Sequence, residues 1–237
     1  MTDRTGAAGR VAPPSAVVFD FDGLVLDTEW CEYETAAAVF ADHGTELSLE
    51  LWRTFIGSTD HPHWADILEE QLGHAVDRAT LVPARHLANW ACARTLEVQA
   101  GVAELIVAVH ADGIPLAVAS SSPAEWVVGH LSERGLLDHF ATICSGDEVH
   151  ATKPDPELYL LACARLGVDP SGAIAVEDSV NGVAAARAAG MSVVAVPSSL
   201  TRGMDFSAAD RVVSSCAELD PFVLGEVIDD ARRRISE

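Results

Sequence analysis

Two carboxylates, Asp20 and Asp22, close a short apolar run that begins at Ala16. Side chains at positions i and i+2 of a strand project to the same side of the sheet. Two such carboxylates repel each other unless a cation or a shared proton holds them together. Gly23 allows a sharp exit from the strand. The alternative, that both acids only cap the next turn, fits the sequence VVFDFDG poorly, so the pair indicates a cation site.

Three consecutive serines follow a second apolar run, at 115–119. Ser122 and Glu125 have the spacing of a capping box, which predicts that Ser122 begins a helix and that Pro123 is its first residue. If all three serines only cap that helix, they have no chemical role. Ser120 lies before the cap, where its hydroxyl and the neighbouring amides face the carboxyl edge of the sheet. A helix N-terminus with free N–H groups suits a phosphate, so we expect Ser120 and Ser121 to bind one.

Lys153 is the only lysine among 15 basic residues. It precedes Asp155 and Pro156, which predict the start of another helix. A lone lysine is normally a solvated surface charge. Where arginine has replaced lysine throughout the rest of the chain, the lysine that remains suits a site too small for a guanidinium. We therefore expect Lys153 to act as a point charge for a phosphate.

Two further acids, Glu177 and Asp178, follow the apolar run at 173–176. Mg²⁺ prefers an octahedral shell of oxygen atoms, supplied by a few carboxylates and water. Asp20, Asp22 and Asp178 could fill such a shell together with water molecules. Capping of the next helix by Asp178 and Ser179 is the alternative.

The apolar runs predict buried strands that alternate with helices. A glycine follows each helix of this part of the chain, as expected of a helix end. Alternating strands and helices imply a parallel sheet with helices on both faces, so we predict a doubly wound α/β core. The predicted strands are 16–21, 115–119, 173–176, 192–196 and, more weakly, 211–213. The predicted core helices are 102–112, 124–134, 157–166 and 180–189.

Residues 28–97 interrupt this alternation with helical stretches and contain four of the five tryptophans. We predict a helical cap inserted after the first strand, with the α/β core formed by 16–27 and 98–237 and a loose tail at 1–15. Trp30 and Trp64 are the tryptophans expected to reach the cleft. The predicted cap helices are 32–43, 49–55, 64–72 and 79–97.

The totals exclude several classes of partner. The net charge of −21 repels nucleic acid and anionic lipid. The five cysteines are odd in number and widely spaced, which favours free thiols in a reducing cytoplasm. We find no signal peptide and no apolar stretch that could span a bilayer. A monomer is expected for a chain of this size.

Four motifs resemble those of the haloacid dehalogenase superfamily: DFDGLVLDT (20–28), the serine after the next core strand, the Lys-Pro pair, and EDSVNGVAAARAAGM (177–191). The inserted helices resemble the capped, β-phosphoglucomutase-like branch, and the resemblance implies a Rossmann-like core. It implies that Asp20 attacks phosphorus to form an aspartyl-phosphate and that Asp22 is the general acid and base.

The same resemblance implies the ligand set. Ser120 and Lys153 would hold the transferring phosphoryl group. Mg²⁺ would bind Asp20, the main-chain oxygen of Asp22 and Asp178, with Glu177 bound to it directly or supporting it. Phosphoryl transfer needs alignment and neutralised oxygen atoms, and these residue types supply both.

This chain differs from several subgroups of the family, and these differences reduce the number of activities to consider. Dehalogenases lack the second acid, so Asp22 speaks against them, and phosphonatases need a cap lysine, which this chain lacks. β-Phosphoglucomutases hold a second phosphate with an arginine shortly after a Gly-x-Ser and with a cap lysine. Here Asp60 lies near the position expected of that arginine, and an acid repels a second phosphate, so a mutase is the runner-up. The sequence favours a phosphatase acting on a small phosphomonoester such as a sugar phosphate. His61 and His63 fit surface or substrate contacts better than a metal pair.

A non-catalytic binding protein on the same fold is the alternative from another class, because fold alone does not fix function. A degenerate site should have lost at least one of the charged groups. All of them are present, which favours an enzyme.

Overall fold

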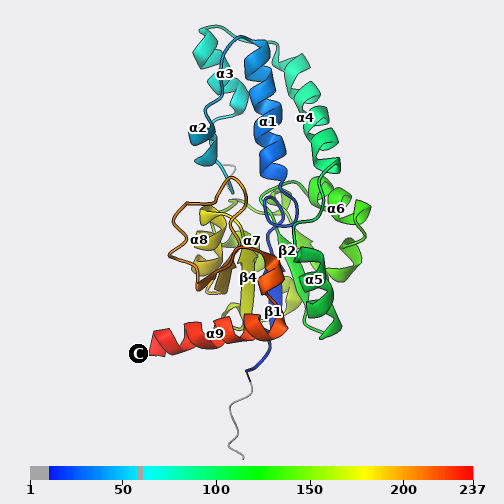
Figure 1. The fold of residues 1–237 in the computed structure, drawn as a ribbon, viewed down its shortest axis with the longest axis vertical. Coiled ribbons are helices and arrows are strands. Elements are labelled where there is room, and N and C mark those ends of the chain that lie inside the picture. The colour runs from blue at the N-terminus through cyan, green and yellow to red at the C-terminus, as the bar shows by residue number, and fades with distance from the viewer. Residues whose placement is uncertain (1–10, 58–60, 237) are drawn as a thin grey trace, which may run out of the picture.

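A six-stranded sheet forms the centre of the computed structural model, which describes residues 11–57 and 61–236 (Figure 1). The strand order is β3-β2-β1-β4-β5-β6, and every pair is parallel. This order reverses direction at β1, as in doubly wound dinucleotide-binding folds. The predicted α/β class is confirmed. The strands are β1 (Ala16–Phe19), β2 (Leu116–Ala119), β3 (Thr142–Cys144), β4 (Ala173–Glu177), β5 (Ser192–Ala195) and β6 (Arg211–Val212).

Both faces of the sheet are covered by helices. In β1, Val17 and Phe19 pack in an apolar cluster with α5, α6 and α9, whereas Ala16 and Val18 pack with α7 and α8 on the other face. A strand buried on both faces has no polar side, which is why its sequence reads as a continuous apolar run. The helices of the core are α5 (Val102–Ala111), α6 (Ala124–Glu133), α7 (Glu157–Leu166), α8 (Val180–Ala188) and α9 (Pro221–Ser236). The 3₁₀ helices are η1 (Leu137–His139), η2 (Gly146–Glu148), η3 (Pro170–Gly172) and η4 (Cys216–Glu218).

Strand β3 was not predicted. It is three residues long, and Thr142 and Ile143 are only half-buried, so the sequence shows neither a long apolar run nor a clear alternation. The predicted tail lies outside the described residues at 1–10. At its end, the backbone N–H of Ser15 donates to the carbonyl of Gly172 over 2.8 Å, which ties this segment to the core.

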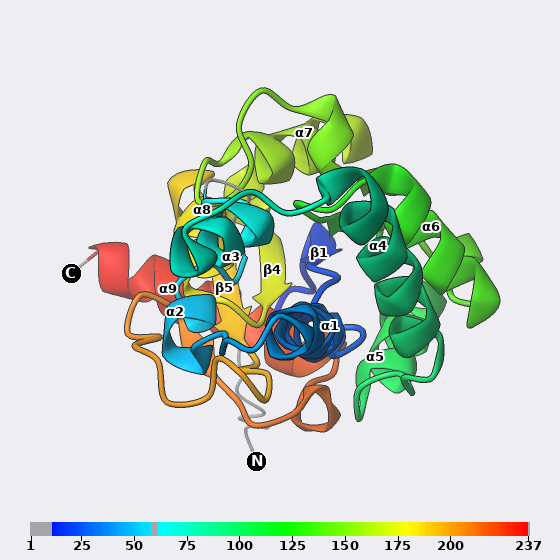
Figure 2. The ribbon, with the colours of Figure 1, turned by 90° about the horizontal axis from the view of Figure 1, so that it is seen from above.

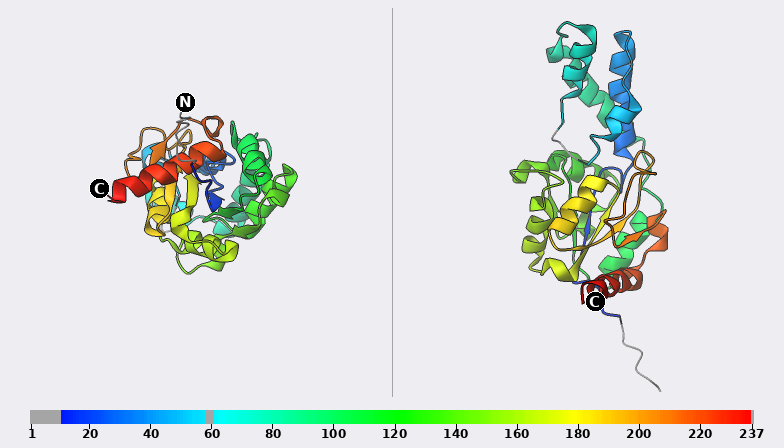
Figure 3. Two further views of the ribbon diagram at one scale, coloured as in Figure 1. Left: turned by 90° about the horizontal axis from the view of Figure 1, so that it is seen from below. Right: turned by 90° about the vertical axis from the view of Figure 1, so that its left-hand side faces the viewer.

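Four helices, which we call the cap helices, stand beyond the carboxyl ends of the strands (Figures 1 and 3). They pack around an apolar cluster of their own that includes Phe40, Trp52, Trp64 and Leu68. Leu200 of the core completes this cluster, so the two parts are in contact. The domain boundaries at residues 28 and 97 stay a prediction. The cap helices are α1 (Thr28–Asp42), α2 (Leu49–Arg53), α3 (Trp64–Leu72) and α4 (Arg78–Arg94).

The prediction that all five cysteines are free thiols is wrong. Cys31 of α1 and Cys92 of α4 form a disulfide with a Cα–Cα distance of 5.8 Å. They lie 61 residues apart in the sequence, and only the packing of α1 against α4 brings them together. The other three cysteines, Cys144, Cys163 and Cys216, are free and buried.

None of the helices that the structure describes combines the length and the apolar character needed to cross a membrane.

Candidate active site

The loop that leaves β1 fixes the positions of Asp20 and Asp22. The N–H of Asp20 donates to the carbonyl of Val176 over 2.9 Å, which continues the pairing of β1 with β4 by one residue. The chain then turns at Gly23, whose N–H donates to Leu26 over 2.7 Å. Gly23 has a φ of +83°, and a Cβ there would lie 2.1 Å from a carboxylate oxygen of Asp178. No other residue fits this turn, because it would both strain the backbone and collide with Asp178.

Lys153 lies between two carboxylates. Its Nζ contacts Oδ1 of Asp20 and lies 2.6 Å from Oε1 of Glu177. The side chain is 2% exposed, although Lys153 belongs to a loop. Burial alone would lower the pKa of Lys153, but the charges of Asp20 and Glu177 raise it above the usual value. Lys153 is therefore a buried ammonium group beside the candidate nucleophile.

Glu177 is fully engaged by protein donors. Its Oε1 also accepts from the hydroxyl of Tyr159 over 2.7 Å. Its Oε2 accepts from the backbone N–H groups of Asp178 and Ser179 over 3.0 and 3.1 Å, and from the Ser179 hydroxyl over 3.1 Å. These contacts favour a role in holding Lys153. Metal ligation by Glu177 stays a prediction.

Asp178 has the opposite surroundings. It is 1% exposed, and neither of its carboxylate oxygens has a hydrogen-bond partner among the described residues. Burial raises the pKa of Asp178 well above the usual value. Burial also raises the pKa of Asp20 to about 8, although the charge of Lys153 opposes this rise.

Oxygen atoms of Asp20, Glu177 and Asp178 lie within 4.8 Å of one another. Three buried carboxylates face a single lysine, so the cluster lacks positive charge, and a buried charge without a partner is costly. A divalent cation with oxygen ligands would supply that charge. The donor set therefore fits Mg²⁺.

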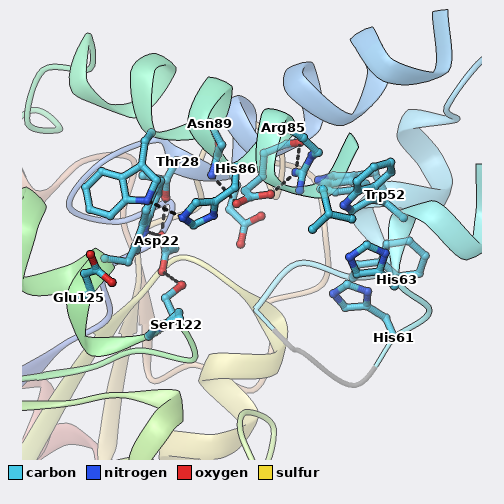
Figure 4. A pocket seen from close by; sticks show the side chains of 18 residues that line it. Asp22, Thr28, Trp52, His61, His63, Arg85, His86, Asn89, Ser122 and Glu125 are labelled. Carbon is cyan, nitrogen blue, oxygen red and sulfur yellow. Dashed lines mark hydrogen bonds and ion pairs between the residues drawn. The ribbon is translucent and has the colours of Figure 1, made fainter. Parts of the chain in front are cut away.

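The carboxylate of Asp22 accepts four hydrogen bonds (Figure 4). Its Oδ1 accepts from the Thr28 hydroxyl over 2.7 Å and from Nε1 of Trp126 over 2.8 Å. Its Oδ2 accepts from the hydroxyls of Ser120 and Ser122 over 3.1 and 2.7 Å. Donors from α1, from α6 and from the loop between β2 and α6 thus converge on one side chain, which fixes its orientation.

The expected capping role of Ser122 is wrong. Helix α6 begins at Ala124, so Pro123 occupies the N-cap position. The Ala124 N–H donates to Oδ2 of Asp147 over 2.8 Å. Because Asp147 from the neighbouring loop satisfies this donor, the Ser122 hydroxyl is available to Asp22. Helix α7 has the predicted range, Glu157–Leu166, but Pro156 rather than Asp155 occupies the N-cap position. The Glu157 N–H donates to Oδ1 of Asp155 over 3.0 Å.

Ser121 borders a small cavity of about 160 Å³ that Asp20 and Lys153 also line. Its hydroxyl oxygen is buried and has no hydrogen-bond partner among the described residues. An unpaired buried hydroxyl costs free energy that a ligand oxygen would recover. The phosphate-binding role of Ser121 stays a prediction, and this cavity is where it would operate.

Seen from above, the cap helices lie in front of the sheet (Figure 2). A larger pocket of about 460 Å³ adjoins the small cavity and is lined by residues of the cap helices and of the core (Figure 4). Trp64 lines it as expected, and so do His61 and His63. Trp30 is 37% exposed and is not among the lining residues. Four further aromatic groups in its wall were not predicted to line it: Trp52, Phe55, Trp90 and Trp126.

Several residues of the site were not found from the sequence. Thr28 is the last residue of the first motif and Glu29 directly follows it, so their position in the sequence was a usable signal. Trp126 and Tyr159 offered none, because each lies within a helix and its contact depends on which face that helix turns toward the sheet edge.

The match with known proteins covers most of the chain. Residues 17–196 match the model of the family described as haloacid dehalogenase-like hydrolase. The protein YhcW of Bacillus subtilis is 40% identical over 205 residues, which cover 86% of this chain and 93% of YhcW. A phosphorylated carbohydrates phosphatase of Thermotoga maritima is 32% identical over 219 residues, covering 90% of this chain and 99% of that protein.

A solved structure agrees with these matches. The crystal structure of a CbbY mutant from Rhodobacter sphaeroides in complex with xylulose 1,5-bisphosphate superposes with a TM-score of 0.73 at 29% identity, covering 87% of this chain and 96% of that one. The resemblance inferred from the four motifs is thus confirmed. This chain belongs to the haloacid dehalogenase-like hydrolases.

Proposed function

We propose that this protein is a Mg²⁺-dependent phosphatase that hydrolyses a small phosphomonoester through an aspartyl-phosphate on Asp20. One observation carries the proposal. The Asp20 carboxylate contacts the buried ammonium of Lys153, and the unpartnered carboxylate of Asp178 lies in the same cluster. An anionic nucleophile, a fixed cation and unused metal ligands are together the components that phosphoryl transfer requires.

In the first half of the reaction, an oxygen of Asp20 attacks phosphorus and the bond from phosphorus to the ester oxygen breaks. Asp22 gives its proton to the departing oxygen, which leaves as an alcohol. Lys153 and Ser121 hold the oxygens of the phosphoryl group. Mg²⁺, held by Asp20, Asp178 and the main-chain oxygen of Asp22, would supply positive charge against which an anionic nucleophile can approach a phosphate dianion.

In the second half, water attacks phosphorus and Asp22 takes its proton. The bond between Asp20 and phosphorus breaks, so phosphate leaves and both acids return to their starting states. The donors around Asp22 keep it in one orientation for both proton transfers, which is the positioning that general acid–base catalysis needs. Ser120 stays a predicted phosphate ligand. Its hydroxyl contacts Asp22 here and accepts from the Ser122 N–H over 3.0 Å.

The substrate class follows from the relatives. The Thermotoga maritima relative is named for phosphorylated carbohydrates, which supports a sugar phosphate. The net charge of −21 supports the exclusion of nucleic acid and anionic membranes as partners. A monomeric state completes the proposal, and gel filtration tests it. The cytoplasmic location stays a prediction, and the disulfide between Cys31 and Cys92 removes the free-thiol argument for it.

Phosphate release from p-nitrophenyl phosphate tests this function. We expect turnover with Mg²⁺, little turnover in EDTA, and a loss of about 10⁴-fold in Asp20→Asn, because the nucleophile is removed. Asp138 is exposed on η1, so Asp138→Asn is a matched control that should keep full activity. A wild type that releases no phosphate, or an active Asp20→Asn variant, rules out the proposal.

Glucose 1-phosphate separates the runner-up functions. A phosphatase yields free phosphate, whereas a mutase yields glucose 6-phosphate without net phosphate release. Binding without either product would favour the non-catalytic alternative.

A further inference from the structure

Glu29 lies between the two cavities of the site. It belongs to the first turn of α1 and lines both the small cavity with Asp20 and Lys153 and the larger pocket. A substrate whose phosphorus is beside Asp20 must therefore extend past Glu29 into the larger pocket. Burial raises the pKa of Glu29 well above the usual value. As a carboxylate or as a neutral acid, this group can accept a hydrogen bond, and in neither form does it attract a phosphate.

Two of the three histidines that line the larger pocket accept a hydrogen bond at a ring nitrogen, and Nδ1 of the third, His61, lies 3.0 Å from the Pro62 carbonyl. Nδ1 of His63 accepts from the Ala65 N–H over 3.1 Å, and Nε2 of His86 accepts from Nε1 of Trp90 over 3.0 Å. A ring nitrogen that accepts a hydrogen bond cannot at the same time donate one, so neither of these two nitrogens offers a proton to a ligand phosphate. Burial also lowers the pKa of His63.

Arg85 is the sole lysine or arginine among the described residues that line this pocket, and Glu32 compensates its charge. The Arg85 guanidinium forms an ion pair with the Glu32 carboxylate and donates to the Glu32 carbonyl over 2.7 Å. Asn89 donates to the same carboxylate (Figure 4). Among the described residues, the pocket beyond the reaction centre therefore offers no uncompensated lysine or arginine for a second phosphate.

The wall of this pocket has spare polar atoms beside aromatic surfaces. Nε of Arg85 and Oδ1 of Asn89 are buried and have no hydrogen-bond partner among the described residues. The Arg85 side chain is 10% exposed and Asn89 is 3% exposed. The guanidinium lies over Trp52 and Trp64, at 6.0 and 5.5 Å from the ring centres. A spare donor, a spare acceptor and apolar ring faces suit a molecule with hydroxyl groups and C–H faces.

We propose that Glu29, together with Arg85 and Asn89, selects phosphate monoesters whose leaving group is polyhydroxylated and carries no second phosphate. This inference rests on the proposed phosphatase activity and defines its substrate class. Glu29 and the spare atoms hydrogen-bond the hydroxyls of the leaving group, and the tryptophans pack against its C–H surface. A second phosphate is rejected because the pocket would leave it unpaired, and rejection of this kind is an efficient source of specificity.

Matched substrate pairs test the exclusion of a second phosphate. The probes are glucose 6-phosphate against glucose 1,6-bisphosphate, fructose 1-phosphate against fructose 1,6-bisphosphate, and ribulose 5-phosphate against ribulose 1,5-bisphosphate, with phenyl phosphate as an ester without hydroxyls. We expect the preferred monophosphate to exceed its bisphosphate in kcat/KM by at least about tenfold. A bisphosphate used equally well or better overturns the proposal, and so does a wild type that uses no sugar monophosphate better than phenyl phosphate.

Substitution of Glu29 tests its part in the selection. In Glu29→Leu we expect the ratio of kcat/KM for the preferred sugar monophosphate to that for phenyl phosphate to fall by about 10- to 100-fold, since the variant cannot hydrogen-bond a hydroxyl. Glu29→Gln keeps that capacity and should recover most of the ratio. Glu34, exposed on the same helix and away from the pocket, provides the control Glu34→Leu, which should leave the ratio unchanged.

Ratios of kcat/KM between substrates test this selection separately from the phosphatase activity on which it rests. A wild type that hydrolyses no phenyl phosphate with Mg²⁺ would refute the phosphatase activity itself. Hydrolysis with an unchanged ratio in Glu29→Leu, or with Glu29→Gln no better than Glu29→Leu, refutes the selection by Glu29 alone. A second variant, Asn89→Leu, should raise KM for the preferred monophosphate more than KM for phenyl phosphate, and an equal rise would exclude Asn89 from the selection.

Discussion

The site has two sides, the sheet edge and the cap helices, and they differ in whether their buried charges are compensated. At the edge of the sheet, Asp20, Lys153 and Glu177 are buried and in direct ionic contact, and Asp178 remains without a partner. The cap helices contribute Trp52, Trp64, Arg85 and Asn89 to the larger pocket, and we call this part of the site the cap wall. There, the charge of Arg85 is already compensated by Glu32, and aromatic rings lie beside it. A site with unbalanced buried charge binds ions and stabilises charge that develops during a reaction. A site with balanced charge and apolar faces distinguishes shapes and hydroxyl groups.

The two sides also differ in what holds them. Backbone pairing between strands positions the groups at the sheet edge, as with the bond from the Asp20 N–H to the Val176 carbonyl. Side-chain contacts between α1 and α4, such as that of Arg85 with Glu32, position the groups of the cap wall. We therefore expect substitutions at the sheet edge to change turnover on every substrate, and substitutions in the cap wall to change the choice among substrates.

The largest effect should come from Lys153→Met. The substitution keeps much of the side-chain length but removes the ammonium from between Asp20 and Glu177. We expect kcat to fall by about 10³-fold, because the transferring phosphoryl group loses a fixed cation in a buried site. Steady-state phosphate release measures this change.

Stability must be measured beside the activity of this variant, since loss of one partner of a buried ion pair costs about 3–5 kcal/mol. Circular dichroism at the assay temperature shows whether the variant is folded. A folded Lys153→Met protein that keeps a tenth of wild-type kcat for p-nitrophenyl phosphate would contradict the assigned role.

The next effect should come from Asp178→Asn, and it concerns the metal. We expect the Mg²⁺ concentration for half-maximal activity to rise by about 10- to 100-fold, since an anionic ligand becomes neutral. In EDTA, the same variant should be at least as stable as the wild type, because a buried carboxylate without a partner is removed.

Thermal unfolding with and without Mg²⁺ distinguishes the two states. A ligand that binds only the folded protein raises its melting temperature, so Mg²⁺ should raise that of the wild type far more than that of Asp178→Asn. Equal shifts in the two proteins would place the metal elsewhere.

The acidic residues at the sheet edge could be predicted from the sequence, because short apolar runs mark where the buried strands end. Asp20, Asp22 and Asp178 each follow an apolar run, and parallel strands bring their carboxyl ends to one edge. Lys153 was found by its rarity rather than by its spacing. The role of each in the reaction came from the family resemblance and stays a prediction.

The residues of the cap wall and their contacts could not be predicted from such patterns. The bond from Trp126 to Asp22 joins residues 104 positions apart, and the disulfide joins cysteines 61 positions apart. Both depend on how helices pack, which periodicity does not specify. Ser122 was misassigned for the same reason, because Asp147 comes from another loop to cap α6. Strand β3 was not predicted because a strand of three residues is too short to show the alternation of apolar and polar side chains.

A smaller effect on turnover should come from Trp126→Phe, which keeps the ring but removes one donor to Asp22. A hydrogen bond to a charged group contributes at least about 1.5 kcal/mol, so we expect kcat to fall by roughly tenfold with an unchanged Mg²⁺ requirement. Trp90 packs against Trp126 with ring centres 4.9 Å apart, but its N–H donates to His86. Trp90→Phe is therefore the matched control, and an equal loss in both variants would assign the effect to packing.

The smallest effect on turnover should come from breaking the disulfide between Cys31 and Cys92, which joins the first turn of α1 to the last turn of α4. We expect kcat to change by less than about threefold, because neither cysteine lines the cavities of the site. The free energy of unfolding should fall by about 2–4 kcal/mol, since the bridge restricts the unfolded chain.

Thiol titration and a double-mutant cycle test this disulfide together. The unfolded protein should show three thiols without reductant and five after reduction, as one bridge and three free cysteines require. Cys31→Ser, Cys92→Ser and the double variant should lose similar amounts of stability, because either single change already removes the whole bridge. Losses that add in the double variant, or five thiols before reduction, would show that the cap helices are held by packing alone.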